Sequence, residues 1–489
     1  MSASFGTNVL KLLSSKIATQ AIAFITAPII ARIFLPEHFG TVQLFSSISG
    51  VIVVISCLRY ELSIPLGRDK NEVIASFIIS VISTLVIALL SFVAVLILKE
   101  KVAIWLKSPE LETFLWFLPL TVLLGGVGNA IRYYASCSGK FGAMAWADFG
   151  SVSGSIFITI LFGLIFGGSA KFLFIGQITG MILGIPILFI FLSREFLSEI
   201  KTANLSIRYI WEVAKQYKKF PIYDIWSGLF NSVSMQLPPI ILGAYFSTTV
   251  VGYYSLGNRF VGLPMALFGG SIAQVFFPSA AKEYNETGKL TNIVSSTFKK
   301  LVQIGVFPFM ILGFFGGPIF SFVFGANWVE AGIYTQILSI WIIFLFMVSP
   351  LTSIFGIIKY QEKFLTYTAF LLFIRFLALV IGSWTGNPRL ALICFALIGA
   401  FSNLVLICLI FFYTKITIKF GVTTFLKYSL LSLLLLIPTF FLELSKVNIL
   451  FIIVSCVIAV IFYTLILCFF ERKSLIFRLR NLFKTSHIG

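Results

Sequence analysis

Charge and histidine are scarce in this sequence of 489 residues. Charged side chains make up 11% of it, and the only two histidines, His38 and His487, have no histidine, cysteine or carboxylate at the spacing of metal ligands. The six cysteines include no C-x-x-C pair, and motifs of nucleotide hydrolysis, serine hydrolysis and zinc proteolysis are absent. We therefore expect free thiols, no metal or other cofactor, and no enzymatic activity.

Apolar residues, by contrast, make up 59% of the chain, which is more than a water-soluble protein could bury. A helix needs roughly 20 apolar residues to cross the hydrocarbon core of a bilayer. The sequence therefore predicts an all-α polytopic membrane protein with about 14 transmembrane helices. The predicted spans are 10–34, 41–66, 73–98, 112–135, 145–166, 172–193, 221–246, 252–278, 300–324, 333–358, 364–384, 390–412, 425–444 and 449–470.

The basic residues lie mostly on one side of these spans. With the N-terminus inside, 27 of the 36 Lys and Arg residues fall in inner segments, seven in outer segments and two within spans. Because cytoplasmic loops are enriched in Lys and Arg, we expect both termini to be cytoplasmic. The net charge of +18 is then explained by contacts with anionic membrane lipids, and no nucleic-acid partner is expected.

A short repeat divides the chain into two halves. Segments 28–40 and 239–252 both contain PII, then an aromatic residue, then Gly40 or Gly252. An even number of spans separates the two segments, so the halves should share one orientation. We expect an N-terminal six-helix bundle in 1–193, a cytoplasmic linker in 194–220, a C-terminal six-helix bundle in 221–415, and two extra transmembrane helices facing lipid with a basic cytoplasmic tail in 416–489.

Two further segments have the pattern of helices that lie on a membrane surface. Residues 207–219 in the linker are amphipathic, with Ile210, Trp211 and Ala214 on one side. Residues 471–484 of the tail either lie along the inner headgroups or act as a simple stop-transfer anchor.

Four arginines are candidates for a cationic cavity, since charge inside a bilayer is costly and should face a cavity or a partner. Arg375 lies near the middle of its span, and Arg259 lies about two turns inside another. Arg59 lies beside Glu61, where the two residues either pair or help to set an inner gate. Arg132 closes its span, where it acts either as a positive-inside anchor or as a substrate contact.

Two aspartates begin predicted spans. Asp224 shares one helix face with Ser227, Gly228, Asn231 and Ser234, which forms a polar stripe on an otherwise apolar helix. Asp148 begins another span without such a stripe. Each aspartate either stabilises a helix N-terminus or binds a proton or cation that biases two conformations, and Glu61 is a further gating candidate. The candidate cavity-lining amides are Gln20, Asn231, Gln236 and Gln274.

Several runs resemble those of Wzx-type O-antigen or polysaccharide flippases, which belong to the multidrug/oligosaccharidyl-lipid/polysaccharide exporter superfamily. They are ARIFLPEHFG at 31–40, LRYE at 58–61, YYSLGNRFVGLP at 253–264 and QVFFP at 274–278. The resemblance covers roughly residues 1–415. It implies two six-helix bundles around a central cavity that opens alternately to each side of a bacterial inner membrane.

The resemblance also implies a substrate: an undecaprenyl-pyrophosphate-linked oligosaccharide, such as an O-antigen or other surface-polysaccharide repeat unit, moved from the cytoplasmic to the periplasmic leaflet. Arginine suits a pyrophosphate because it forms charge-assisted hydrogen bonds with it, so Arg59, Arg132, Arg259 and Arg375 are its expected contacts. Coupling to a proton or sodium gradient, as in the family, would suit Asp224. The polysaccharide polymerase machinery is a candidate partner.

Three alternatives remain. A lipid II flippase of the same superfamily would share these features. A cation-coupled multidrug exporter would favour deep acidic residues in the first six spans, which show arginines instead. A membrane glycosyltransferase or polymerase would need a sizeable outer loop, and no predicted outer loop exceeds about 14 residues.

Overall fold

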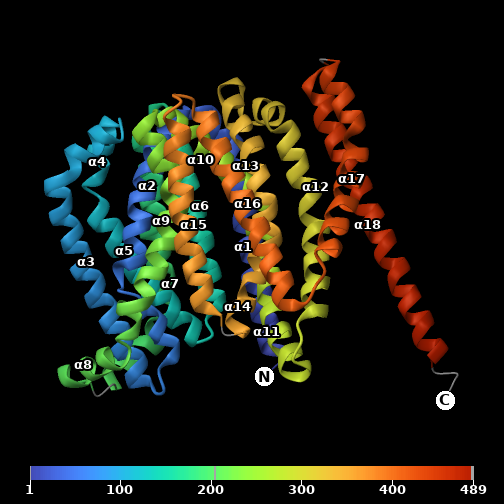
Figure 1. The fold of residues 1–489 in the computed structure, drawn as a ribbon. Helices are drawn as coiled ribbons and strands as arrows, with labels where there is room; N and C mark the ends of the chain where they lie inside the picture. The colour runs from blue at the N-terminus through green and yellow to red at the C-terminus, as the bar shows by residue number, and fades with distance from the viewer. Residues whose placement is uncertain (1, 203–204, 359, 446, 486–489) are drawn as a thin grey trace. The chain divides into compact units, whose positions relative to one another are not determined.

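The computed structural model describes residues 2–202, 205–358, 360–445 and 447–485, and it confirms an all-α fold (Figure 1). The side chains of 2–16, 194–195, 197, 200–202, 270–271, 274, 361 and 470–485 are not described, so Gln274 and the predicted surface tail 471–484 lie outside the described side chains. The longer helices are α1 (Ser2–Ile33), α2 (Pro36–Ser56), α3 (Lys70–Trp105), α4 (Pro109–Leu115), α5 (Leu118–Cys137), α6 (Phe141–Phe166), α7 (Ala170–Thr202), α8 (Ile207–Gln216), α9 (Ile225–Tyr245), α10 (Thr248–Val261), α11 (Gly270–Thr287), α12 (Thr291–Phe324), α13 (Val329–Val348), α14 (Ile354–Ile357), α15 (Gln361–Ser383), α16 (Pro388–Thr414), α17 (Ile418–Leu444) and α18 (Ile449–Thr485). Short 3-10 turns are η1 (Tyr60–Leu66), η4 (Ala326–Trp328) and η5 (Ser349–Ser353), and π-helical turns are η2 (Phe220–Asp224) and η3 (Met265–Gly269).

Ten helices in the described residues are long and apolar enough to cross a bilayer. An eleventh span arises if α4 and α5, which are bent by 52° at their junction, count as one. The remaining predicted spans fall on α1, on α9 with its polar stripe, and on α10 with α11, where η3 intervenes. The chain is therefore a multi-pass membrane protein, and the count of 14 stays a prediction.

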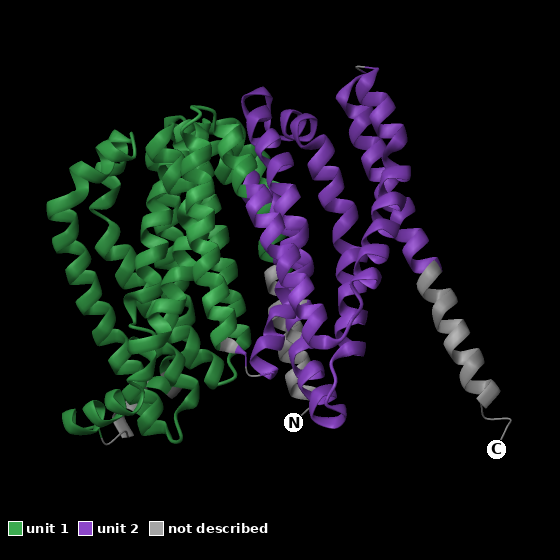
Figure 2. Cartoon of the chain, in the orientation of Figure 1, with its two compact units in different colours: residues 1–256, 362–395 green, residues 257–361, 396–489 purple. Residues whose placement is uncertain are grey.

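The chain forms two compact units (Figure 2). Unit 1 comprises residues 1–256 and 362–395, and unit 2 comprises residues 257–361 and 396–489. The predicted division into bundles at 1–193 and 221–415 stays a prediction.

Within unit 1, the linker helix α8 docks on α3 through Glu72, near the start of α3. The Glu72 carboxylate accepts hydrogen bonds from Tyr217 Oη (2.9 Å), from Gln216 Nε2 and from the backbone N–H of Arg68 (2.8 Å). Val213 of α8 is buried against apolar residues of α3. Ile210 and Ala214 also pack against this cluster, whereas Ile207 and Trp211 are exposed. The apolar side predicted from Ile210, Trp211 and Ala214 is thus divided between the protein and the surface, and a position of α8 on the membrane stays a prediction.

Side-chain contacts in unit 1 join loops that the sequence places on the same side of the membrane. Among the inner segments, Glu199 accepts a hydrogen bond from Tyr134 (2.6 Å) and pairs with Lys70 (3.1 Å). Among the outer ones, Lys107 Nζ donates to the carbonyl of Tyr245 (2.8 Å). These contacts agree with the predicted alternation of the spans.

The first turns of α2 and α10 pack backbone to backbone through Gly40 and Gly252. A Cβ atom on Gly40 would lie 1.7 Å from the carbonyl oxygen of Thr248, and one on Gly252 would lie 1.8 Å from that of Pro36. Each glycine therefore lies against the carbonyl four residues before the other. Gly40 and Gly252 are equivalent in the sequence repeat, so the contact is reciprocal, as a local two-fold axis requires.

In unit 2, α17 and α18 pack on α12. Tyr428 accepts a hydrogen bond from Gln303 Nε2 (2.6 Å), and Tyr463 donates one to the Gln303 carbonyl (2.8 Å). The ring of Tyr463 also stacks on Phe307, with centroids 4.4 Å apart. The two extra helices thus have a protein-facing side that a purely lipid-facing appendage would lack, while Leu430, Leu434 and Phe441 are exposed.

Replacing either reciprocal glycine by alanine should destabilise the protein, because a methyl group cannot fit against a backbone carbonyl. Gly40→Ala and Gly252→Ala should each lower the unfolding free energy by about 1–3 kcal/mol. Gly142→Ala, at a helical glycine with open space around it, should change it by less than about 1 kcal/mol. Unfolding in detergent micelles measures all three, and equal effects would contradict the close contact.

Glu199 should make stability depend on pH. Burial would raise the pKa of its carboxyl, but the hydrogen bonds from Tyr134 and Lys70 outweigh burial and lower that pKa below its ordinary value of 4.5. The ionised form therefore stabilises the fold above about pH 4.5, and this contribution is lost as the pH falls. Glu199→Gln should be less stable than the native protein at pH 7, with a smaller difference at lower pH. A constant difference would refute this account, and Glu212→Gln at an exposed pair is the control.

Candidate functional site

The polar stripe predicted on residues 224–234 runs along α9 from the turn η2. Ser227 and Asn231 are exposed, the Asp224 side chain is 40% exposed, and Ser234 is buried. Ten residues of helix rise by about 15 Å, so the stripe presents polar groups over half the thickness of a hydrocarbon core. The structure places an arginine at each end of it.

Arg59 meets the stripe at Asp224. Its Nε donates to Asp224 Oδ2 at 2.9 Å, and its Nη1 lies 3.5 Å from Glu61 Oε1. Leu58 and Arg59 both have left-handed backbone conformations, with φ of 50° and 65°, in the turn between α2 and η1. Such conformations are costly for residues with a Cβ, so the surrounding structure holds this arginine in a strained turn.

Gly228 gives the Arg59 side chain its space. A Cβ at this position would lie 3.3 Å from Arg59 Nε, which is tighter than usual. Glu61 is buried, and among the described residues its Oε2 atom has no hydrogen-bond partner. The predicted Arg59–Glu61 pair therefore exists, but Asp224 makes the shorter contact.

Arg132 of α5 pairs with Asp148 of α6, with Nη2 and Oδ1 2.6 Å apart. Both side chains are half-buried. Arg132 also lines a cavity of about 170 Å³ between α5, α6 and α7, together with Asn129 and Ser151. The structure thus pairs Arg132 with Asp148, two candidates that the sequence analysis treated separately. The pairing could not be predicted because the sequence does not show which faces of two successive spans meet.

Arg375 of α15 lies at the other end of the stripe. It is buried, and its Nη1 donates to Ser234 Oγ at 3.3 Å. Its guanidinium carbon lies 5.9 Å from the centroid of the Phe395 ring, a distance at which cation–π attraction operates. Arg375 therefore occupies an interior position and does not snorkel to the membrane surface.

Three further site candidates from the sequence are Arg259, Gln20 and Gln236. Arg259 belongs to α10 in unit 2 and has an exposed side chain. Gln20 of α1 and Gln236 of α9 are half-buried. Gln236 packs closely on Gly50, because a Cβ atom on Gly50 would lie only 3.3 Å from Gln236 Nε2.

Two amides that the sequence did not single out connect α2 to its neighbours. Gln43 Oε1 accepts a hydrogen bond from Ser255 of α10 at 3.1 Å, and Gln177 of α7 exchanges bonds with Ser46 at 3.1 and 3.2 Å. The sequence could have indicated these two residues only as amides within apolar spans. Many spans contain such an amide, so this feature does not single them out.

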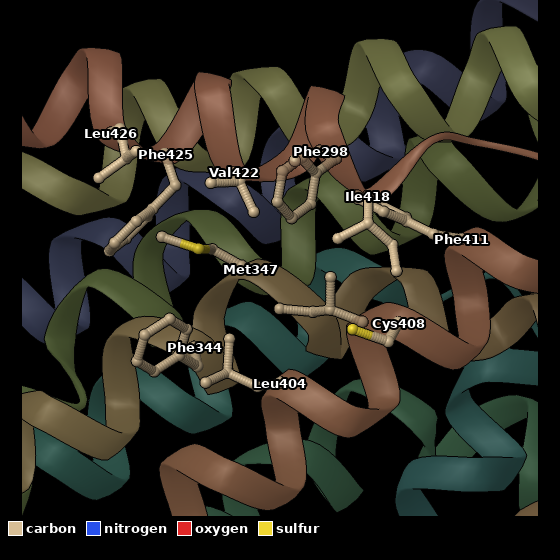
Figure 3. A pocket seen from close by; sticks show the side chains of 12 residues that line it. Phe298, Phe344, Met347, Leu404, Cys408, Phe411, Ile418, Val422, Phe425 and Leu426 are labelled. Atoms are coloured by element: carbon tan, nitrogen blue, oxygen red, sulfur yellow. The ribbon is translucent and has the colours of Figure 1, made fainter.

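Unit 2 contains an apolar pocket of about 150 Å³ between α12, α13, α16 and α17 (Figure 3). Its lining is carbon and sulfur only, from residues such as Phe298, Met347, Phe411 and Phe425. In the described ranges, no group of three His, Cys, Asp or Glu side chains could hold a metal ion.

Residues 29–333 match the family described as "Polysaccharide biosynthesis protein". The chain belongs to this family. The resemblance to polysaccharide flippases found in the sequence is thereby confirmed at the level of the family. Two curated relatives are similar to this chain over part of their length: the succinoglycan biosynthesis transport protein ExoT of Rhizobium meliloti (strain 1021), 22% identical over 65% of this chain, and the capsular polysaccharide biosynthesis protein CapF of Staphylococcus aureus, 30% identical over 47%. The matches span 62% and 57% of those relatives.

Solved structures of known transporters share the fold of this chain. The lipid II flippase MurJ in an inward closed conformation superposes with a TM-score of 0.69 at 15% identity, covering 97% of this chain and 99% of MurJ. An inward-facing multidrug resistance transporter of the MATE family, from the MOP superfamily, gives a TM-score of 0.64 at 15% identity, covering 82% and 98%. The chain therefore has the same fold as these two proteins.

The Arg59–Asp224 pair should be energetically coupled. In a double-mutant cycle with Arg59→Gln and Asp224→Asn, the coupling energy of unfolding should be about 1 kcal/mol, since both side chains are partly exposed. The same cycle for Lys282 and Glu286, an exposed pair at 3.8 Å, should give about 0.5 kcal/mol or less. A coupling no larger than in this control would mean that Asp224 does not hold Arg59.

Proposed function

We propose that this protein moves a polyprenyl-pyrophosphate-linked oligosaccharide, a repeat unit of a surface polysaccharide, across the bacterial cytoplasmic membrane by alternating access. The observation that carries the proposal is the accessible polar stripe of α9 with Arg59 at one end and Arg375 at the other. Family membership and the names of the two curated relatives support a polysaccharide as the cargo.

The charge of the cargo explains the arginines. A pyrophosphate carries at least two negative charges, and its transfer through a medium of low dielectric constant needs counter-ions that stay charged. Arginine meets this need and binds phosphate oxygens with paired hydrogen bonds. The exposed hydroxyl and amide groups of Ser227 and Asn231 can replace water around a sugar, while the polyprenyl tail can remain in the bilayer.

The Arg59–Asp224 pair suggests how an ion gradient couples to transport. The Asp224 carboxylate pairs with the Arg59 guanidinium at 2.9 Å. A pyrophosphate that binds Arg59 would displace this carboxylate, which would then bind a proton or a sodium ion. Loss of that ion would restore the pair and release the pyrophosphate. Arg132 and Asp148 form a second pair that can exchange in the same way.

The alternatives fit the site less well. A multidrug exporter that binds cations needs carboxylates free of cationic partners, yet Asp148 and Asp224 both pair with arginine. A lipid II flippase would use the same pyrophosphate chemistry, so only the identity of the glycan separates it from the function proposed. A glycosyltransferase or polymerase is disfavoured by the short outer loops.

Both termini are proposed to lie in the cytoplasm. The distribution of Lys and Arg supports this orientation, as do the contacts between loops of the same side in unit 1. The polysaccharide polymerase machinery, which would consume the translocated unit, is the proposed partner.

Deleting the gene in a strain that produces the polysaccharide should cause the lipid-linked oligosaccharide to accumulate on the cytoplasmic leaflet. Complementation with Arg375→Ala should lower surface glycan by at least about ten-fold, because a charge-assisted contact is lost, and Asp224→Asn should make transport insensitive to collapse of the ion gradient. Protein levels should not change, and Arg208→Ala, at an exposed surface position, is the matched control.

An accumulated unit with the composition of lipid II would favour the lipid II flippase instead. Absence of any accumulated lipid-linked glycan would refute flipping, and full activity of Arg375→Ala would refute the cationic site.

A further inference from the structure

Three connections of unit 2 meet in a second pocket, of about 340 Å³, which lies apart from the α9 stripe in the chain. They are the connections between α11 and α12, between α14 and α15, and between α16 and α17. The sequence places all three on the inner side of the membrane. The polar lining includes Tyr284, Lys289, Thr291, Tyr360, Tyr413 and Lys415.

Lys415 occupies a position that normally favours glycine. The end of α16 has the hydrogen bonds of a Schellman motif, from Ile416 N–H to the Phe411 carbonyl (2.9 Å) and from Lys415 N–H to that of Phe412 (3.3 Å). Lys415 itself has a left-handed backbone with φ of 56°. Glycine avoids the steric cost of this conformation. Lysine at position 415 is therefore less favourable for stability than glycine would be, which is consistent with a role for its side chain.

Lys289 brings a second positive charge to the same pocket. It directly follows Gly288, which ends α11 in a left-handed conformation with φ of 67°, and its N–H donates to Thr287 Oγ1 at 3.2 Å. Both Lys289 and Lys415 are exposed, and in the described part of the chain neither forms an ion pair. Two lysines that line the pocket are therefore available to an anion.

The two acidic residues closest to Lys289 in the sequence, Glu283 and Glu286, interact with other groups. Glu283 Oε1 accepts a hydrogen bond from the Ile293 N–H at 3.3 Å, and Glu286 lies 3.8 Å from Lys282. Tyrosines complete the polar lining, with the rings of Tyr360 and Tyr413 5.0 Å apart. Their hydroxyl groups can donate to phosphate oxygens or bind the hydroxyl groups of a headgroup.

The connection between α16 and α17 also reaches the apolar pocket. Phe411 precedes Tyr413 by two residues and Ile418 follows Lys415 by three, and both line the apolar pocket, where Figure 3 shows them at the same end. Phe412 between them is 77% exposed. One short segment thus presents cationic and tyrosine groups on one side and apolar groups on the other, which matches an amphiphile better than a free ion.

We propose that this pocket binds the phosphate headgroup of an anionic membrane phospholipid. Lys289 and Lys415 contact the phosphate, the tyrosines contact the headgroup hydroxyls, and an acyl chain extends beside Phe411 and Ile418. The proposal is independent of the cargo and requires only that these three loops lie at a membrane surface, where a basic residue gains from anionic lipid.

Lys415→Gly tests this proposal without destabilising the fold. The substitution removes the ammonium group, and glycine adopts the left-handed backbone conformation of this position without steric cost. Without added lipid, its melting temperature in detergent should equal or exceed that of the native protein. Phosphatidylglycerol should raise the melting temperature of the native protein more than phosphatidylcholine does, and much less so in Lys415→Gly and Lys289→Ala. By native mass spectrometry, each variant should bind phosphatidylglycerol about five-fold more weakly.

Lys419→Ala removes the same charge from a nearby exposed position outside the pocket and should behave like the native protein. An unchanged phosphatidylglycerol effect in both pocket variants would overturn the proposal. An equal stabilisation by inorganic phosphate alone would also overturn it, because the ligand would then be a free anion. A reduced effect in Lys419→Ala as large as in Lys415→Gly would reduce the site to diffuse surface charge.

Discussion

The reciprocal contact between Gly40 and Gly252 is the constraint on which the arrangement of α2, α9 and α10 depends. Two helices can approach this closely only where both lack a Cβ atom, and here each glycine faces the carbonyl of the other helix. The same pair of helices is joined by the Ser255–Gln43 hydrogen bond. Farther along the chain, α2 ends in the turn that carries Arg59. The contact at one end of α2 therefore fixes the helix whose other end presents the arginine to Asp224.

The sequence predicted the helices and one of their polar faces, because apolar runs and helical spacing are local properties. It identified Arg59, Arg132, Asp148 and Asp224 individually but not their pairing. Arg59 reaches Asp224 across 165 positions of the chain, and it does so from a left-handed turn that no propensity favours for arginine. The sequence repeat, by contrast, identified Gly40 and Gly252 as equivalent positions. In the structure these two glycines pack against each other's helix in the same way.

Charge in unit 1 is used sparingly and in pairs. Arg132 is paired with Asp148, and Arg59 faces two carboxyl groups, those of Asp224 and Glu61; such pairing lowers the cost of placing ionised groups near the hydrocarbon. Arg375 is stabilised differently, by a hydroxyl group and an aromatic ring. Arg59 and Arg132 each face a carboxylate, whereas Arg375 contacts a neutral hydroxyl group and an aromatic ring.

The π-helical turn η2 has a consequence for the pair at the start of α9. A π turn holds one residue more than an α turn, and it ends at Asp224. Conversion of this turn to α-helical geometry would rotate the helix on one side of it by about 100° relative to the other. The position of Asp224 opposite Arg59 therefore depends on the π-helical geometry of residues 220–224, which directly precede α9.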